Sequence, residues 1–183
     1  VNNIAAWDGA VWSGLGTGVN NQVWSLAVSP TTGDLYAAGM FNVAGGVTAN
    51  RVARWNGSAW SSLGTGTANG VGSSAYSVAV LPNNDVVVGG NFLSAGGVST
   101  RRYIARWDGA VWSSFGFVSN TVLTVCAMPN GDVVAGGLFT SPASKIARWD
   151  GTAWSPLGSG LNFQPIAMMV LESGSLVAAG HFT

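Results

Sequence analysis

Charge is scarce in this sequence. Only 8% of its 183 residues are Asp, Glu, Lys or Arg, and the formal net charge is zero. Proteins that bind nucleic acid or anionic membranes carry a basic field that attracts the partner, so this composition argues against both kinds of partner. One Cys, Cys126, and one His, His181, exclude an internal disulfide and cannot supply the usual ligands of zinc or copper. We therefore expect neither a metal nor a cofactor.

Long hydrophobic runs and a helical period are missing as well. Hydrophobic residues make up 48% of the chain, which is enough for a core, yet no stretch approaches the roughly 18 to 20 apolar residues of a membrane helix. The apolar residues instead come in short runs of alternating character, broken by Gly, Asn, Asp, Ser and Pro. Such a pattern predicts an all-β chain.

A tandem repeat organises the chain. Each copy has a strand-like segment ending in Trp, an Asp-Gly or Asn-Gly dipeptide, and a second Trp five positions after the first. This dipeptide is the strongest short hairpin signal, because both residues tolerate positive φ. The paired tryptophans are Trp7 and Trp12, Trp55 and Trp60, Trp107 and Trp112, and Trp149 and Trp154.

A second block lies between the tryptophan pairs and predicts another hairpin. A polar turn leads into a short apolar strand that ends in Gly and, two residues later, Phe. The predicted strand pairs are 23–28 with 35–41, 75–81 with 86–92, 122–128 with 133–139, and 166–171 with 176–182.

Four strands per repeat indicate a propeller. The first tryptophans of successive copies are 48, 52 and 42 positions apart, a spacing typical of a propeller blade of about 40 to 50 residues. We predict a single domain over 1–183, with repeats at approximately 4–51, 52–103, 104–145, and 146–183 together with 1–3.

The repeats resemble those of kelch-type propellers. The resemblance rests on the glycine pairs Gly89-Gly90 and Gly136-Gly137, on the aromatic-acidic pair Trp107-Asp108 and on the Trp after the turn, and it runs over all 183 residues. It implies a β-propeller of four-stranded blades, with three whole blades and one split between the termini. Gly39 and Gly180 depart from the pattern because Ala precedes each of them.

Three arrangements of the split blade are open at this point. Pairing of 176–182 with 4–7 would close a four-bladed ring and leave no exposed sheet edge. Two chains that exchange ends would instead form an eight-bladed ring as a homodimer, and the segment also suits a place in a longer array.

The repeated tryptophans and arginines are predicted to be structural. Regularly spaced indoles suit packing between adjacent blades. Arginines precede the first Trp in three copies, where a guanidinium stacks on an indole or pairs with an Asp; they are Arg54, Arg106 and Arg148. Trp24 lies outside the repeat pattern, with Asn20 and Gln22 nearby, and these three residues are the candidates for ligand binding, as an aromatic platform for a sugar.

No constellation of catalytic residues is evident in the sequence. Each Asp stands alone in its turn, which argues against a calcium site, and the single His leaves no nucleophile and base pair. The resemblance extends to the propellers of galactose oxidase-like enzymes, but their copper-binding Tyr and His set has no counterpart here. We therefore predict a protein that is not an enzyme.

The predicted function is a scaffold for binding or assembly. Its partner would be a second copy of the chain, or a protein or glycan ligand. Abundant Gly, Ser, Thr and Asn with few charges is typical of exported repeat proteins, so we expect an extracellular or cell-surface location. The alternatives are a lectin-like, carbohydrate-binding propeller and an engineered or recently amplified repeat protein whose role is self-assembly.

Overall fold

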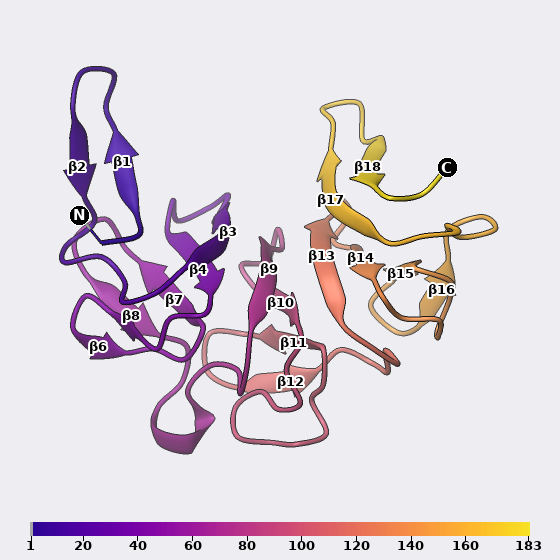
Figure 1. Ribbon diagram of the computed structural model, residues 1–183, viewed down its shortest axis with the longest axis horizontal. Helices are drawn as coiled ribbons and strands as arrows, with labels where there is room; N and C mark the ends of the chain where they lie inside the picture. The colour runs from indigo at the N-terminus through magenta and orange to yellow at the C-terminus, as the bar shows by residue number, and fades with distance from the viewer. Residues whose placement is uncertain (1) are drawn as a thin grey trace.

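The chain folds into short antiparallel β-sheets, shown in Figure 1 for a computed structural model that describes residues 2–183. Three of the sheets have four strands each, and we call them blades 1, 2 and 3. Blade 1 contains β3 (Val23–Val28), β4 (Leu35–Gly39), β7 (Val52–Trp55) and β8 (Trp60–Ser62); blade 2 contains β9 (Ala75–Val80), β10 (Val86–Gly90), β11 (Ile104–Trp107) and β12 (Trp112–Ser114); blade 3 contains β13 (Val122–Ala127), β14 (Val133–Gly137), β15 (Ile146–Trp149) and β16 (Trp154–Pro156).

A two-stranded sheet lies at each end of this series. The N-terminal half-blade pairs β1 (Ala5–Trp7) with β2 (Trp12–Gly14), and the C-terminal half-blade pairs β17 (Pro165–Val170) with β18 (Leu176–Gly180). The loop after blade 1's inner hairpin adds the small pair β5 (Val43–Ala44) and β6 (Val47–Thr48), and Gly66–Ala68 forms a single 3-10 turn.

The sheets are arranged as in a propeller. The first strand of each sheet contacts the first strand of the next, in the order β3, β9, β13 and β17, and the other strands extend outward from this inner row (Figure 1). The predicted four-stranded antiparallel repeats and the all-β, propeller-like architecture are therefore confirmed. No helix among residues 2–183 has the length and apolar character needed to cross a membrane.

The series of sheets is an open arc. The two half-blades lie at its opposite ends (Figure 1), and within residues 2–183 β1 pairs only with β2 and β18 only with β17. The closed four-bladed ring, one of the three arrangements considered above, is therefore absent from this structure.

The core lies between neighbouring sheets. Val78 on β9 packs with Tyr36 and Ala38 of blade 1, and Val125 on β13 packs with Val87 of blade 2. Alternation along the inner strand places one set of side chains toward the preceding sheet and the other toward the following sheet. Each inner strand therefore has two apolar faces, and burial of both requires a neighbour on each side.

Candidate functional site

The paired tryptophans hold adjacent sheets together. In every copy the two rings face each other across the hairpin, with centroids 5.5 to 5.6 Å apart. The second ring of three copies also donates its indole N–H to a backbone carbonyl of the preceding sheet; the pairs are Trp60 to Leu15 at 2.8 Å, Trp112 to Leu63 at 2.9 Å and Trp154 to Phe115 at 2.8 Å. These indoles are thus engaged in packing between sheets.

The tryptophans of the first copy differ from the others. Trp7 is exposed, and Trp12 has 68% of its surface accessible. The hairpin that carries them has the same cross-strand register as the other hairpins. The difference therefore arises from the missing neighbour and not from the local fold.

The repeated arginines form ion pairs within their own sheet. The Arg54 guanidinium lies 2.7 Å from Asp34, and that of Arg106 lies 2.6 Å from Asp85. Arg148 pairs with Asp132 in the same way. The sequence left two roles open for these arginines, stacking on an indole or pairing with an Asp. In the structure they pair with an Asp, and the pair joins the second and third strands of each blade.

The remaining aspartates form the hairpin turns. In each of these turns one carboxylate oxygen accepts two backbone N–H groups; for Asp150 the donors are the amides of Thr152 and Ala153, at 2.8 and 2.9 Å. Bonds to these amides and to the Thr152 hydroxyl lower the pKa of Asp150 to about 2. Backbone N–H groups also lower the pKa of Asp8 and of Asp108. All six aspartates are therefore engaged in structural contacts.

The three candidate ligand-binding residues lie at the start of the inner strand β3 and in the loop before it. Trp24 is 40% exposed, and its ring centroid is 5.1 Å from that of Tyr76. Gln22 is exposed, but the Asn20 side chain is occupied, since it bonds Asn42 at 2.6 Å and accepts a backbone N–H of the same residue. The structure thus brings Trp24 together with Tyr76 and ties Asn20 into loop contacts.

A cleft adjoins Trp24. It lies between β1 and β3, has a volume of about 480 Å³, and we call it the β1–β3 cleft. Its lining residues are Asn3, Ile4, Ala5, Val23, Trp24, Ser25 and Leu26. In blades 1, 2 and 3 the corresponding place, inward of the third strand, is filled by the sheet's own second strand.

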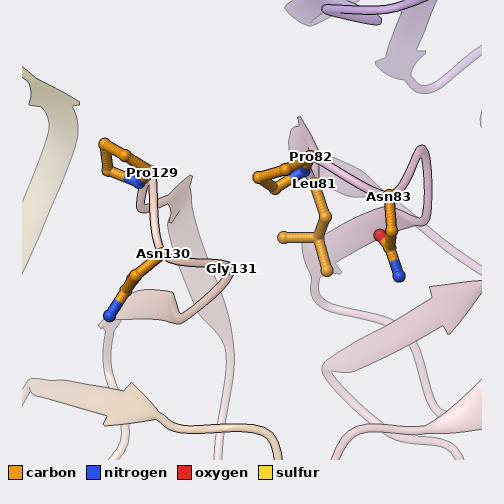
Figure 2. Close-up of a pocket in the computed structure, with 6 residues that line it drawn as sticks. All are labelled: Leu81, Pro82, Asn83, Pro129, Asn130 and Gly131. Atoms are coloured by element: carbon orange, nitrogen blue, oxygen red, sulfur yellow. The ribbon is translucent and has the colours of Figure 1, made fainter.

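The inner hairpin turns form a second surface, which the sequence analysis missed. Equivalent turn positions carry Pro30, Pro82, Pro129 and Glu172, which we call the proline rim. All four line one cavity of about 320 Å³, together with Val80, Ala127, Met128, Val170 and Leu171. A neighbouring pocket of about 290 Å³ separates the turns that carry Pro82 and Pro129 (Figure 2). The signal in the sequence was Pro at the same turn position in three of the four copies.

The residues of potential chemical interest do not converge. The His181 ring nitrogen lies 3.2 Å from the Gln164 amide at the exposed end of β18. Burial raises the pKa of the Cys126 thiol, which disfavours the reactive thiolate. Among residues 2–183, no group of three or more His, Cys, Asp or Glu side chains is placed to hold a metal ion.

Comparisons with known proteins do not assign the chain to a family. No protein-family model matches the sequence, and no curated protein matches it. Among solved structures, the chain is similar to "YCF48 bound to D1 peptide", with 16% identity and a TM-score of 0.48, over 85% of this chain and 44% of that one. The chain thus spans less than half the length of that protein's chain. The propeller-like architecture rests on the sheets described above.

Proposed function

We propose that this protein is a non-enzymatic binding scaffold whose ligand site is the proline rim. The observation that carries the proposal is the convergence of all four inner turns on one cavity of about 320 Å³. Each of the first three inner turns contributes a proline to this cavity, and the fourth contributes Glu172. The cavity is thus a shared feature of the array, and no single repeat forms it.

The distribution of polar groups supports binding over catalysis. A general acid and base need two titratable side chains near the substrate, whereas the six aspartates are engaged in ion pairs and turns. Glu172 is the acidic side chain that faces the rim cavity. A lone carboxylate among apolar side chains suits recognition of a cation and not proton transfer.

The chemistry of the rim favours a short protein segment as the ligand. Proline, valine, methionine and leucine side chains line most of the cavity and suit apolar side chains of a peptide. Glu172, at its edge, suits a Lys or Arg of the same peptide. The expected ligand is an extended segment with an apolar residue next to a basic one.

A selection from a phage-displayed random dodecapeptide library tests this proposal. Peptides enriched on the wild-type chain should combine apolar and basic residues. Synthetic copies should bind the Pro129→Glu variant at least about tenfold more weakly, because the new carboxylate occupies apolar surface. Pro156→Glu is the matched control: this proline is also exposed, but it lies at the end of β16, where other copies have Gly or Ser.

Two outcomes of the selection would contradict the proposal. One is equal affinity of the selected peptides for wild type, Pro129→Glu and Pro156→Glu, which would place their site elsewhere. The other is the absence of enrichment. Glu172→Gln adds a separate readout, since loss of the carboxylate should weaken basic peptides several-fold and reduce the salt dependence of their binding.

Carbohydrate binding is a second candidate, favoured by the aromatic pair at the other end of β3. The half-exposed Trp24 ring next to Tyr76 offers a face for stacking on a sugar. Titration with a panel of methyl glycosides, followed by tryptophan fluorescence, would test it. Saturable quenching that disappears in Trp24→Ala is the expected result, and no response to any glycoside would reject this candidate.

The kelch-type identity of the repeats and an extracellular or cell-surface location belong to the same proposal. The first is supported by the glycine pairs and the Trp-Asp motif, and the second by the low charge and the Gly-, Ser-, Thr- and Asn-rich composition. Secretion of a reporter fused to the natural gene product would test the location.

A further inference from the structure

The N-terminal edge of the arc exposes a face that the other blades bury. Leu26 on β3 is 53% exposed, whereas its counterpart Val78 on β9 is 5% exposed against blade 1. Val28 on β3 is likewise exposed, and its counterpart Val80 is buried. The face of blade 1 toward the N-terminal half-blade is therefore built as a junction between sheets.

The C-terminal edge exposes the complementary face. Val177 on β18 is 44% exposed, whereas its counterpart Val87 on β10 is fully buried between blades 2 and 3. Met169 on β17 points the same way and is exposed. These are the positions that contact the following sheet in blades 1 and 2, so this edge is built to receive one.

A tryptophan and its acceptor are unmatched at opposite ends. Trp12 is the counterpart of the indole donors Trp60, Trp112 and Trp154, and among residues 2–183 its indole N–H has no acceptor within hydrogen-bonding distance. The Leu157 carbonyl is the counterpart of the acceptors Leu15, Leu63 and Phe115, and it accepts only the Gly160 amide, at 3.0 Å, within the same range. One edge therefore presents a donor and the other presents the matching acceptor.

The space beside this carbonyl also has the shape of an indole site. A Cβ added to Gly116, beside the acceptor Phe115, would lie 2.7 Å from Trp149 and Trp154 of the next hairpin. Around Gly158, beside Leu157, no atom other than those of Gly158 and its two chain neighbours lies within 4 Å of the same position. Gly158 keeps the left-handed φ of +57°, so the site keeps its backbone conformation without an indole.

The two half-blades also match as strands. β4 reads Leu35-Tyr36-Ala37-Ala38-Gly39, and β18 reads Leu176-Val177-Ala178-Ala179-Gly180. In blade 1, Leu35 lies opposite Trp55 and Ala37 opposite Ala53. The same register would place Leu176 opposite Trp7 and Ala178 opposite Ala5.

Asn3 already has the backbone conformation that this register needs. Its φ of +59° matches the +66° of Arg51, the residue before β7, and a left-handed residue also precedes β11 and β15. Arg51 accepts the Gly39 amide at 2.9 Å and donates to the Phe41 carbonyl at 2.8 Å. In a completed blade, Asn3 would make the same two bonds with Gly180 and Phe182.

The half-blades have also lost the same ion pair. Blades 1, 2 and 3 each have an arginine in the third strand and an aspartate before the second strand. The equivalent positions of the half-blades are Ala6 and Ser175. Loss of one member alone would leave a charge without its partner. The absence of both members therefore fits two half-blades that together form one blade.

We propose that the C-terminal half-blade of one copy of this chain docks into the β1–β3 cleft of a second copy. β18 then pairs with β1, and Trp12 of one copy donates to the Leu157 carbonyl of its partner. The two half-blades lie at opposite ends of the arc (Figure 1), so in this arrangement each copy supplies the complement of an edge of its partner. Two such contacts, related by a two-fold axis, form a ring of six whole and two composite blades. The proposal is independent of the proline rim.

Light scattering coupled to size exclusion tests the assembly. The expected mass is twice the 18.6 kDa of one chain. Leu26→Lys should raise the dissociation constant at least about 100-fold, because it places an unpaired charge in the contact. Val111→Lys is the matched control, since Val111 is equally exposed but lies at the tip of the β11–β12 hairpin.

Mixing two variants makes the test specific for the two edges. Val177→Glu alone should also dissociate the dimer, and an equimolar mixture with Leu26→Lys should recover a heterodimer, because one contact is then wild type and the other joins opposite charges. A dimer that neither variant affects would show that another surface holds it, and would overturn the proposal.

The lost ion pair gives a second, independent measurement. A chain carrying Ala6→Arg mixed with one carrying Ser175→Asp should associate about twofold to fivefold more tightly than either chain alone. No coupling between the two positions would show that the half-blades do not meet. A mass of one chain at all concentrations would overturn the proposal, and so would a mass that keeps rising with concentration, because the contact would then not close a two-fold ring.

Discussion

The junctions inside the arc and its two open edges are built from the same repeat, yet they differ in almost every measure of burial. Trp112, at the junction of blades 1 and 2, is 3% exposed, whereas Trp12, at the N-terminal edge, is 68% exposed. The local hairpins are alike, so the environment of each side chain is set by the neighbouring sheet. The stability of such an array is the sum of the stability of each repeat and the interaction energy between neighbouring repeats. At the open edges the interaction with a neighbour is missing, so they show the contribution of the repeat alone.

The largest difference is expected between two tryptophan truncations. Trp112→Ala should lower the free energy of unfolding by about 3 to 5 kcal/mol, as for other buried aromatic side chains. Trp12→Ala should lower it by no more than about 1 kcal/mol, which corresponds to its pairing with Trp7. Urea unfolding at concentrations where the chain is monomeric measures both. Equal losses would mean that burial between sheets contributes little.

A matched pair of glycines gives the next largest difference. Gly116 and Gly158 have φ values of +70° and +57°, so Ala costs about 1 to 2 kcal/mol at either position for the left-handed backbone. At Gly116 the new Cβ also collides with two indoles, which adds about 1 to 3 kcal/mol. Gly116→Ala should therefore be the more destabilising in thermal unfolding of the monomer. In the proposed dimer Gly158→Ala should also weaken association.

The strand pattern was predictable from the sequence because it depends on local signals. Asp-Gly and Asn-Gly mark the outer hairpins, and the strands that they separate pair as predicted. The open arc was not predictable, because closure depends on how far each sheet turns relative to the next. That angle depends on the packing between sheets, which alternation along a strand does not report.

The contacts between distant residues were only partly predictable. Pairing of the arginines with an Asp was one of two alternatives, and the sequence held an unused signal, since the split blade lacks both the arginine (Ala6) and the aspartate (Ser175). The proline rim was missed because its residues come from four separate turns. Asn20 was a candidate for ligand binding because it lies near Trp24 in the sequence, but its contact with Asn42 across 22 positions appears only in the fold.

Replacing the ion pair of an internal blade with the Ala and Ser of the split blade should have a smaller effect on stability. Arg148→Ala should destabilise the monomer by about 1 kcal/mol, because the largely buried Asp132 loses its partner. Adding Asp132→Ser, which copies Ala6 and Ser175, should recover part of that loss. The measurement is a double-mutant cycle in urea. A double variant as unstable as the sum of the two single variants would indicate that the residues act separately, and would weaken the argument from the joint replacement.

The smallest effect is expected in the hairpin turns, which internal and edge repeats share. The folded-state pKa of Asp150, about 2, lies below the ordinary value of about 3.9. Its ionised form therefore stabilises the fold fully above about pH 4, and that contribution is lost as the pH falls toward 2.

Asp150→Asn should keep the turn, because the side-chain oxygen of Asn56 accepts the same two backbone N–H groups in its own turn. The variant should also flatten the decline in unfolding midpoint between pH 4 and pH 2. Asp8→Asn, at the open edge, should flatten it less, because Asp8 has no neighbouring hydroxyl corresponding to that of Thr152. An unchanged pH profile in both variants would show that these turns do not contribute to acid sensitivity.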